Sequence, residues 1–307
     1  MAGVADYQRA IPSWHLRFRA SYPRHLKGIT LPIYTSGMQR AQFTFAGRVA
    51  ILALAGASAL GQGYHVVPVT NGGTISGTVK WSGPAGPKLE VAINKDTEIC
   101  DPESRKTRNL ERLVVGPDGG VANTVVYLKN VASGKAMDLP QARRSLDQKR
   151  CRYEPHILLV PQSDKLSMKS SDHVLHTVHS DGAAGFNIAF PFTDHVTTQT
   201  VSTAGLINLK CNGGHSWMNA EVMVVSHPYY AVTGEDGKFE LTDVPPGDYQ
   251  IVAWHEGWSI MGKESALDVF SQKQVQRALF SDPRTWEQAV SVRSGAAANV
   301  KFVISQK

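Results

Sequence analysis

Short apolar, β-branched runs separated by glycine, proline, asparagine and aspartate recur from residue 72 to residue 256. The run Gly73–Trp81 alternates polar and apolar side chains, which is the period-two pattern of a half-buried strand. The other segments that we expect to be strands are 110–115, 123–129, 156–160, 206–210, 221–225, 287–292 and 299–304. Regularly spaced short strands predict an all-β fold built as a sandwich.

One segment departs from this pattern. Residues 263–277 are rich in Lys, Glu, Ala, Leu and Gln, contain no proline or glycine after Lys263, and space their apolar side chains as a helix would. This composition favours a short helical insertion before the last pair of strands.

The first 61 residues have the features of a leader. Arg40 and Arg48 precede the apolar run 49–60, and Ala57-Ser-Ala59 has the small-residue pattern of a signal-peptide cleavage site. The apolar run is shorter than an ordinary transmembrane helix. Met38 stands where such a signal would begin, so residues 1–37 would come from an upstream start codon. Export predicts a periplasmic or extracellular protein, and an uncleaved membrane anchor is the alternative.

The basic balance of the chain belongs to this leader. Of 32 Lys and Arg and 26 Asp and Glu, seven basic residues and one acid lie within residues 1–60, so the remainder carries 25 of each. No basic patch is left on which nucleic-acid binding could be argued. About 245 residues remain, which is enough for one large or two ordinary domains.

A set of soft and imidazole ligands lies in the second half of the chain. Cys211, His215 and Met218 fall within eight residues, and His176 lies 35 residues upstream of the cysteine. Two His and one Cys with a weak axial Met are the ligands of a mononuclear blue-copper site, in which sulfur suits Cu(I) and imidazole tolerates Cu(II). The alternative is a buried thiol beside a surface histidine, with Met218 filling the core.

Two further cysteines and several polar residues surround this set in the sequence. Cys100 and Cys151 remain as a pair if Cys211 binds metal, and they form either a disulfide or two separate buried thiols. Trp217 is expected to pack over the site and exclude water. Side chains that could hydrogen-bond a ligand or the ligand loop, or be ordinary surface and turn residues, are His156, Asp172, His179 and Asn187.

Residues 145–226 resemble the cupredoxin family in the order of strands and ligands. The resemblance implies that His176 is the first ligand, Cys211 the thiolate, His215 the second imidazole and Met218 the axial group. Three residues separate Cys211 from His215, where plastocyanin-like proteins usually have two. This spacing resembles the dinuclear copper motif of cytochrome oxidase subunit II, but that motif needs a Cys at position 207, which is Ile. One copper ion is therefore implied.

Residues 233–255 are similar to carboxypeptidase regulatory-like, or transthyretin-like, β-sandwich domains. The resemblance rests on Gly237-Lys-Phe239 and on the turn Val244-Pro-Pro-Gly-Asp-Tyr249. Segments 75–79 and 124–128 resemble earlier strands of the same sandwich. We therefore expect a cupredoxin Greek-key sandwich over 139–226, inserted in or fused to a sandwich made of 62–138 and 227–307. The combination resembles bacterial exported proteins of the methylamine-utilisation type.

These observations favour an exported electron carrier over an enzyme. The chain has no Gly-x-Ser-x-Gly elbow, no His-Glu-x-x-His and no phosphate-binding glycine loop. The cupredoxin resemblance implies single-electron transfer to a redox partner of the cytochrome or oxidase type, with the edge of His215 as the usual exit. A copper-handling or storage protein and a structural or adhesion module without metal are the alternatives. The aromatic segments 227–230 and 254–256 are expected to stack at a domain junction, rather than to form a second metal site.

Overall fold

The computed structural model describes residues 63–84 and 89–306. These residues belong to one compact unit, 58–307. The expected leader and start codon lie outside the described residues. Within the described residues the fold is all-β, as predicted, and its helical elements are one turn at α1 (Thr97–Cys100) and one 3₁₀ turn (Gln141–Arg144). None of the described helices has the length and apolarity to cross a membrane.

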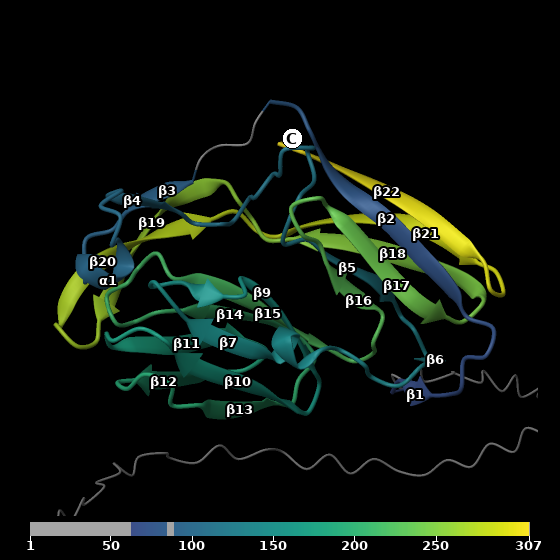
Figure 1. Ribbon diagram of the computed structural model, residues 1–307, viewed down its shortest axis with the longest axis horizontal. Coiled ribbons are helices and arrows are strands. Elements are labelled where there is room, and N and C mark those ends of the chain that lie inside the picture. Colours follow the sequence, from purple (N-terminus) through teal and green to yellow (C-terminus); the bar gives the residue numbers. More distant parts are fainter. Residues whose placement is uncertain (1–62, 85–88, 307) are drawn as a thin grey trace, which may run out of the picture. The chain divides into compact units, whose positions relative to one another are not determined.

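Two sheets combine strands from the beginning and the end of the described chain (Figure 1). The first sheet has the order β16 (Tyr230–Val232), β5 (Val125–Lys129), β18 (Gly247–His255), β21 (Arg284–Val292). The second has the order β17 (Lys238–Val244), β2 (Gly73–Ser82), β22 (Ala297–Ser305). Because β2 and β5 pair with strands that begin at residue 230 or later, this sandwich closes around the intervening part of the chain.

The intervening residues form two more sheets. The five-stranded sheet has the order β12 (Phe186–Phe190), β11 (His176–Gly182), β14 (Gly205–Lys210), β15 (Asn219–Val225), β9 (Ile157–Pro161). The four-stranded sheet has the order β13 (Thr197–Val201), β10 (Asp164–Ser170), β7 (Ser145–Gln148), β8 (Tyr153–Glu154). Alternate side chains of these strands, among them Leu166, Met168 and Val178, are fully buried and form the core between them.

Three two-stranded ribbons complete the fold. They pair β1 (His65–Val66) with β6 (Ser133–Gly134), β3 (Glu90–Ala92) with β4 (Thr107–Asn109), and β19 (Ile260–Asp268) with β20 (Lys273–Phe280). The last of these ribbons contradicts the predicted helix over 263–277. Exposed and half-buried side chains alternate along most of β19, and Gln272 takes a positive φ of 57° where the chain reverses. Tertiary pairing therefore overrides the helical propensity of this segment.

Two other strand predictions need correction. Residues 110–115 do not form a strand, because Glu111 adopts a left-handed φ of 61° and interrupts the extended backbone. Strands β21 and β22 cover the predicted segments 287–292 and 299–304, but they do not pair with each other. Strand β21 pairs with β18 and β22 pairs with β2, in the two different sheets of the sandwich.

The five-stranded sheet sets up the ligand positions. Strand β11 begins at His176, and its antiparallel register with β14 pairs His179 with Lys210, the last residue of β14. The chain then leaves the sheet over residues 211–218, which we call the ligand loop, and returns at Asn219 in β15. The start of β11 and the ligand loop therefore lie at the same end of the sheet.

Candidate metal centre

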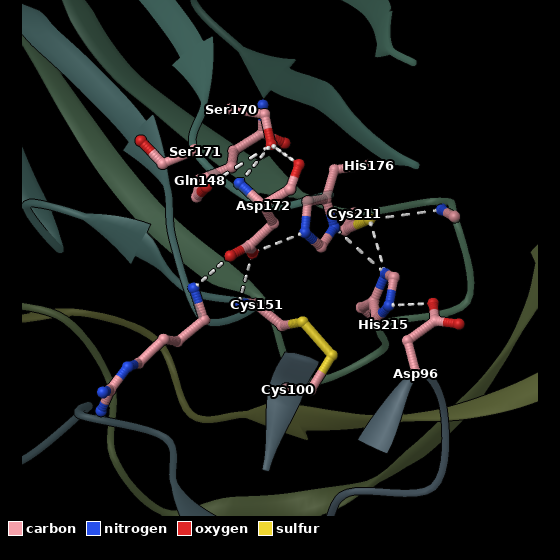
Figure 2. Close-up of polar contacts among 12 residues, drawn as sticks. Asp96, Cys100, Gln148, Cys151, Ser170, Ser171, Asp172, His176, Cys211 and His215 are labelled. Carbon is pink, nitrogen blue, oxygen red and sulfur yellow. Dashed lines mark hydrogen bonds and ion pairs between the residues drawn. A yellow bond between two sulfur atoms is a disulfide. The ribbon is translucent and has the colours of Figure 1, made fainter. Parts of the chain in front are cut away.

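Three potential ligands meet at this end of the sheet. The Nδ1 atoms of His176 and His215 are 3.2 Å apart, and the Sγ of Cys211 lies 3.8 Å from Nδ1 of His215. All three ligand atoms lie within 4.8 Å of one another, and Figure 2 shows the side chains converging. Metal bonds to imidazole nitrogen and thiolate sulfur are about 2.0–2.3 Å long, as known for zinc. One ion of similar size therefore fits between these three atoms.

Met218, the fourth predicted ligand, ends the ligand loop. It is buried in the same core cluster as Cys211 and Trp217, and its backbone N–H donates to the carbonyl of His215 at 3.0 Å. A planar group of two His and one Cys with a nearby Met is the donor set of a blue-copper site. The buried cluster of His176, Cys211, His215 and Met218 resembles a type 1 copper site.

The sulfur of Cys211 is held by hydrogen bonds as well as by its place in the loop. The backbone N–H of Gly213 donates to Sγ at 3.3 Å, and the hydroxyl of Thr177 lies 3.8 Å from it. That hydroxyl also accepts the N–H of Asn212 at 2.7 Å. Burial raises the pKa of Cys211, but the hydrogen bonds and charges of the two histidines outweigh it, and the pKa falls well below its usual value. The site therefore favours the thiolate that a metal requires.

Each histidine ligand is backed by a carboxylate on its outer nitrogen. Nε2 of His176 is 2.9 Å from Oδ2 of Asp172, and Nε2 of His215 is 2.8 Å from Oδ2 of Asp96. Burial lowers the pKa of His176, but the hydrogen bonds to Asp172 and Cys211 outweigh it and raise this pKa to about 9. Such carboxylate partners fix the tautomer, so that Nδ1 presents its lone pair towards the ligand cluster.

Asp172 is itself firmly held. Its carboxylate accepts the backbone N–H groups of Arg150 at 2.6 Å and of Cys151 at 2.7 Å. Burial raises the pKa of Asp172, but its hydrogen bonds to His176 and to these two amides lower it below its usual value. The carboxylate is therefore kept ionised opposite the His176 ring.

The site is closed to water on every ligand. His176 and His215 are 0% exposed and Cys211 is 1% exposed. Trp217 packs edge-on against His215, with ring centroids 5.4 Å apart, and donates its Nε1–H to the carbonyl of Cys151 at 3.0 Å. The His215 edge, which the cupredoxin resemblance implies as the electron exit, is not itself exposed, because Trp217 and Asp96 cover that ring.

The structure separates the other candidate residues from the cluster. His179 lies half-buried on β11 with its Nε2 3.3 Å from Asp181, and Asn187 is exposed on β12 opposite it. His156 is buried, but its Nε2 pairs with Glu256, which also forms a 2.8 Å ion pair with Arg112. Within the part of the chain that the structure describes, none of these three residues belongs to the ligand cluster. None of them forms a side-chain hydrogen bond to the ligand loop.

The remaining pair of cysteines lies beside the cluster. Cys100 and Cys151 are joined by a disulfide, and both are fully buried. Both sulfur atoms lie within 4.8 Å of an imidazole nitrogen of His215.

The segments 227–230 and 254–256 hold stacked aromatics, such as Tyr127 on Tyr230 at 4.9 Å. The described residues do not bring their histidines into a cluster of metal-binding side chains.

Several residues that hold the ligand loop in place could not be identified from the sequence. Lys95 donates to the carbonyl of Gly213 at 2.6 Å and pairs with Asp268 at 2.8 Å. Arg277, on β20, donates to the carbonyl of Cys211 at 2.8 Å. Like Asp96, these residues are far along the chain from the loop residues that they contact. Lys, Asp and Arg are common surface residues, and no sequence motif connects residues so far apart. The sequence therefore could not show that they contact the ligand loop.

Comparison with known families gives one match, to part of the sandwich that β16, β17 and β18 help to form. Residues 226–280 match the family described as BOS complex subunit NOMO1-like, second β-sandwich domain. No curated protein matches the chain.

Several solved structures are similar to part of the chain. A reduced tryptophan-to-tyrosine mutant of amicyanin is 22% identical over 29% of this chain and 87% of its own, with a TM-score of 0.25. The purple cupredoxin from Nitrosopumilus maritimus is 18% identical over 26% and 98%, with a TM-score of 0.23. The copper-containing nitrite reductase from Thermus scotoductus SA-01 is 16% identical over 30% and 24%, with a TM-score of 0.25. The candidate metal centre rests on the geometry of its own side chains, not on these likenesses.

Proposed function

We propose that this protein holds one copper ion between His176, Cys211 and His215, with Met218 as the axial group, and carries single electrons between redox partners. The observation that supports this is the convergence of two Nδ1 atoms and one thiolate sulfur in a buried site. When bound, copper would supply a centre that gains and loses one electron.

The protein's contribution is to keep these ligands still. His176 and His215 are each fixed by a carboxylate, and Cys211 is fixed by the amide of Gly213. The carbonyl groups of the ligand loop are held by Lys95 and Arg277. Ligands whose positions are determined from outside need to move little between two oxidation states, and this is what an electron carrier requires.

Burial of the site favours electron transfer over catalysis on a bound substrate. The ligands are at most 2% exposed, so a substrate could not reach the metal without displacing the residues around it. Electrons, in contrast, can pass through a few ångströms of protein. Asp96, whose side chain is 33% exposed, contacts the outer nitrogen of His215 and provides a hydrogen-bonded link from that ring towards the surface.

Spectroscopy of the copper-loaded protein tests this proposal. We expect an intense thiolate-to-copper charge-transfer band and the electron paramagnetic resonance spectrum of a single Cu(II) in residues 62–307. Cys211→Ser should abolish the band, whereas Met261→Leu, which changes an exposed thioether on β19, should leave it unchanged. A band that survives in Cys211→Ser would contradict the assignment.

The copper-handling alternative predicts different kinetics. A cargo site should surrender copper to an excess of chelator within the mixing time, whereas an enclosed carrier should release it slowly. Failure to bind copper in a one-to-one ratio would instead favour a structural module. Export to the periplasm or cell surface, and a partner of the cytochrome or oxidase type, remain part of the proposal and follow from the leader and the ligand set.

A further inference from the structure

A short segment from outside the cupredoxin-like sheets covers the second histidine. Residues 89–110 contain β3, α1 and β4, and we call them the covering segment. Two consecutive side chains of this segment reach the ligand loop. Asp96 contacts Nε2 of His215 at 2.8 Å, and Lys95 donates to the carbonyl of Gly213 at 2.6 Å. Figure 2 shows Asp96 facing the His215 ring.

The backbone at Asp96 is arranged for this contact rather than for the helix that follows. Asp96 precedes α1, where an Asp side chain usually caps the first amides, yet it makes no side-chain cap. Its φ of 47° and ψ of 45° are left-handed, a conformation that disfavours most L-residues and least disfavours Asn and Asp. The carboxylate is thereby turned away from α1 and towards His215.

The disulfide fixes the covering segment next to the site. Cys100 ends α1, four residues after Asp96, and is bonded to Cys151 across 51 residues of sequence. The amide of Cys151 donates to Asp172, and its carbonyl accepts the Trp217 indole. Arg108 of the same segment donates to the carbonyl of Cys151 at 2.8 Å. One covalent bond therefore joins the partner of His215 to the loop that holds the partner of His176.

We propose that Asp96 is a positioning residue of the copper centre, which the Cys100–Cys151 disulfide holds against His215, and that it biases the centre towards Cu(II). This inference rests on the proposed copper function. A carboxylate that accepts the Nε2–H of His215 keeps the lone pair on Nδ1 and makes that nitrogen a stronger donor. Its negative charge stabilises a doubly charged ion more than a singly charged one.

The direct test replaces the charge and keeps the shape. Asp96→Asn preserves a residue type that tolerates the left-handed backbone and can still accept the hydrogen bond. Mutation of such a partner typically lowers metal affinity about 10- to 100-fold. We expect this loss for Cu(II), measured by chelator competition, and a smaller loss for Cu(I). Each factor of ten by which the loss of Cu(II) affinity exceeds the loss of Cu(I) affinity raises the reduction potential by about 59 mV.

Glu98→Gln is the matched control, because it removes the same charge from an exposed position two residues away. We expect its affinities and potential to equal those of the wild type. Cys100→Ala/Cys151→Ala should shift the potential in the same direction as Asp96→Asn, and combining the three substitutions should add little. Equal potentials in Asp96→Asn and Glu98→Gln would overturn the proposal.

A measurement on the unmodified protein covers the case in which a variant fails to fold. In the wild type loaded with Cu(I), nitrogen NMR should find a proton on Nε2 of His215 in slow exchange with water. An unprotonated or rapidly exchanging Nε2 would overturn the role of Asp96. Failure of the wild type to bind copper at all would instead overturn the proposed function, so the two failures are distinguishable.

Discussion

At the scale of single residues, Thr177 links strand β11 to the ligand loop. Its hydroxyl accepts the Asn212 amide at 2.7 Å and lies 3.8 Å from the sulfur of Cys211. Thr177→Val keeps the shape and leaves that amide without its acceptor, which should cost about 1–3 kcal/mol of unfolding free energy. Denaturant titration of the metal-free protein measures this, with the exposed Thr198→Val as control. Equal stability of the two variants would contradict the assigned role.

Glu221, on β15, provides a prediction about pH. Burial, with the nearby charge of Glu256, raises its pKa to about 8, although Arg112 lies close. A typical unfolded Glu titrates near about 4.3. Between about pH 4.3 and pH 8, the Glu221 carboxyl therefore holds a proton in the folded state but not in the unfolded state. The contribution of this group to stability is lost as the pH rises towards 8.

Glu221→Gln should remove that slope. Its unfolding free energy should change less between pH 5 and pH 8 than that of the wild type, by up to about 1.4 kcal/mol per pH unit. Titrating groups that do not interact with Glu221 affect both proteins equally. Glu240→Gln, at an exposed position on β17, is the control and should keep the wild-type slope. Parallel pH profiles for the wild type and Glu221→Gln would be evidence against this account.

At the scale of elements, the ribbon of β19 and β20 replaces the predicted helix and serves the site. The amide of Val269 donates to the carbonyl of Asn212 at 3.0 Å, and Arg277 donates to that of Cys211 at 2.8 Å. An extended ribbon brings both its turn and its second strand to the ligand loop. The contacts of this segment with the ligand loop therefore depend on its strand structure, although its composition favours a helix.

Arg277→Met should loosen the ligand loop. The substitution keeps an unbranched apolar stem but removes the donor to the Cys211 carbonyl, so the loop should open more often. We expect copper release to a chelator to become faster, roughly tenfold for a lost charged hydrogen bond of about 1.5 kcal/mol. The control is Arg293→Met, which lies exposed outside this contact. Equal release rates in the two variants would exclude the role of the ribbon.

At the scale of the whole molecule, sequence patterns predicted the β fold and the four clustered residues because both depend on local order. Alternation in segments such as 73–81 is a property of one strand, and the Cys211–Met218 spacing lies within one loop. The supporting residues Asp96 and Arg277 could not be predicted. Their contacts depend on which strands pair across more than 100 residues and on a disulfide whose partners sequence alone left open.

The five-stranded and four-stranded sheets therefore do not make the site by themselves. Asp96, Lys95 and Arg277 all lie outside residues 139–226, and each contacts the ligand loop. The sandwich is built from chain segments on both sides of those sheets, so the segments that leave it can reach the end of the sheets where the candidate ligands cluster. We infer that the segments outside residues 139–226 help to set the metal affinity and reduction potential of the proposed copper centre.

X-ray absorption at the copper edge of the loaded wild type tests the central claim most directly. We expect one copper per chain, with one short bond to sulfur and two bonds to imidazole nitrogen, and loss of the short sulfur bond in Cys211→Ser. A first shell of only nitrogen and oxygen, or a spectrum that Cys211→Ser leaves unchanged, would contradict it.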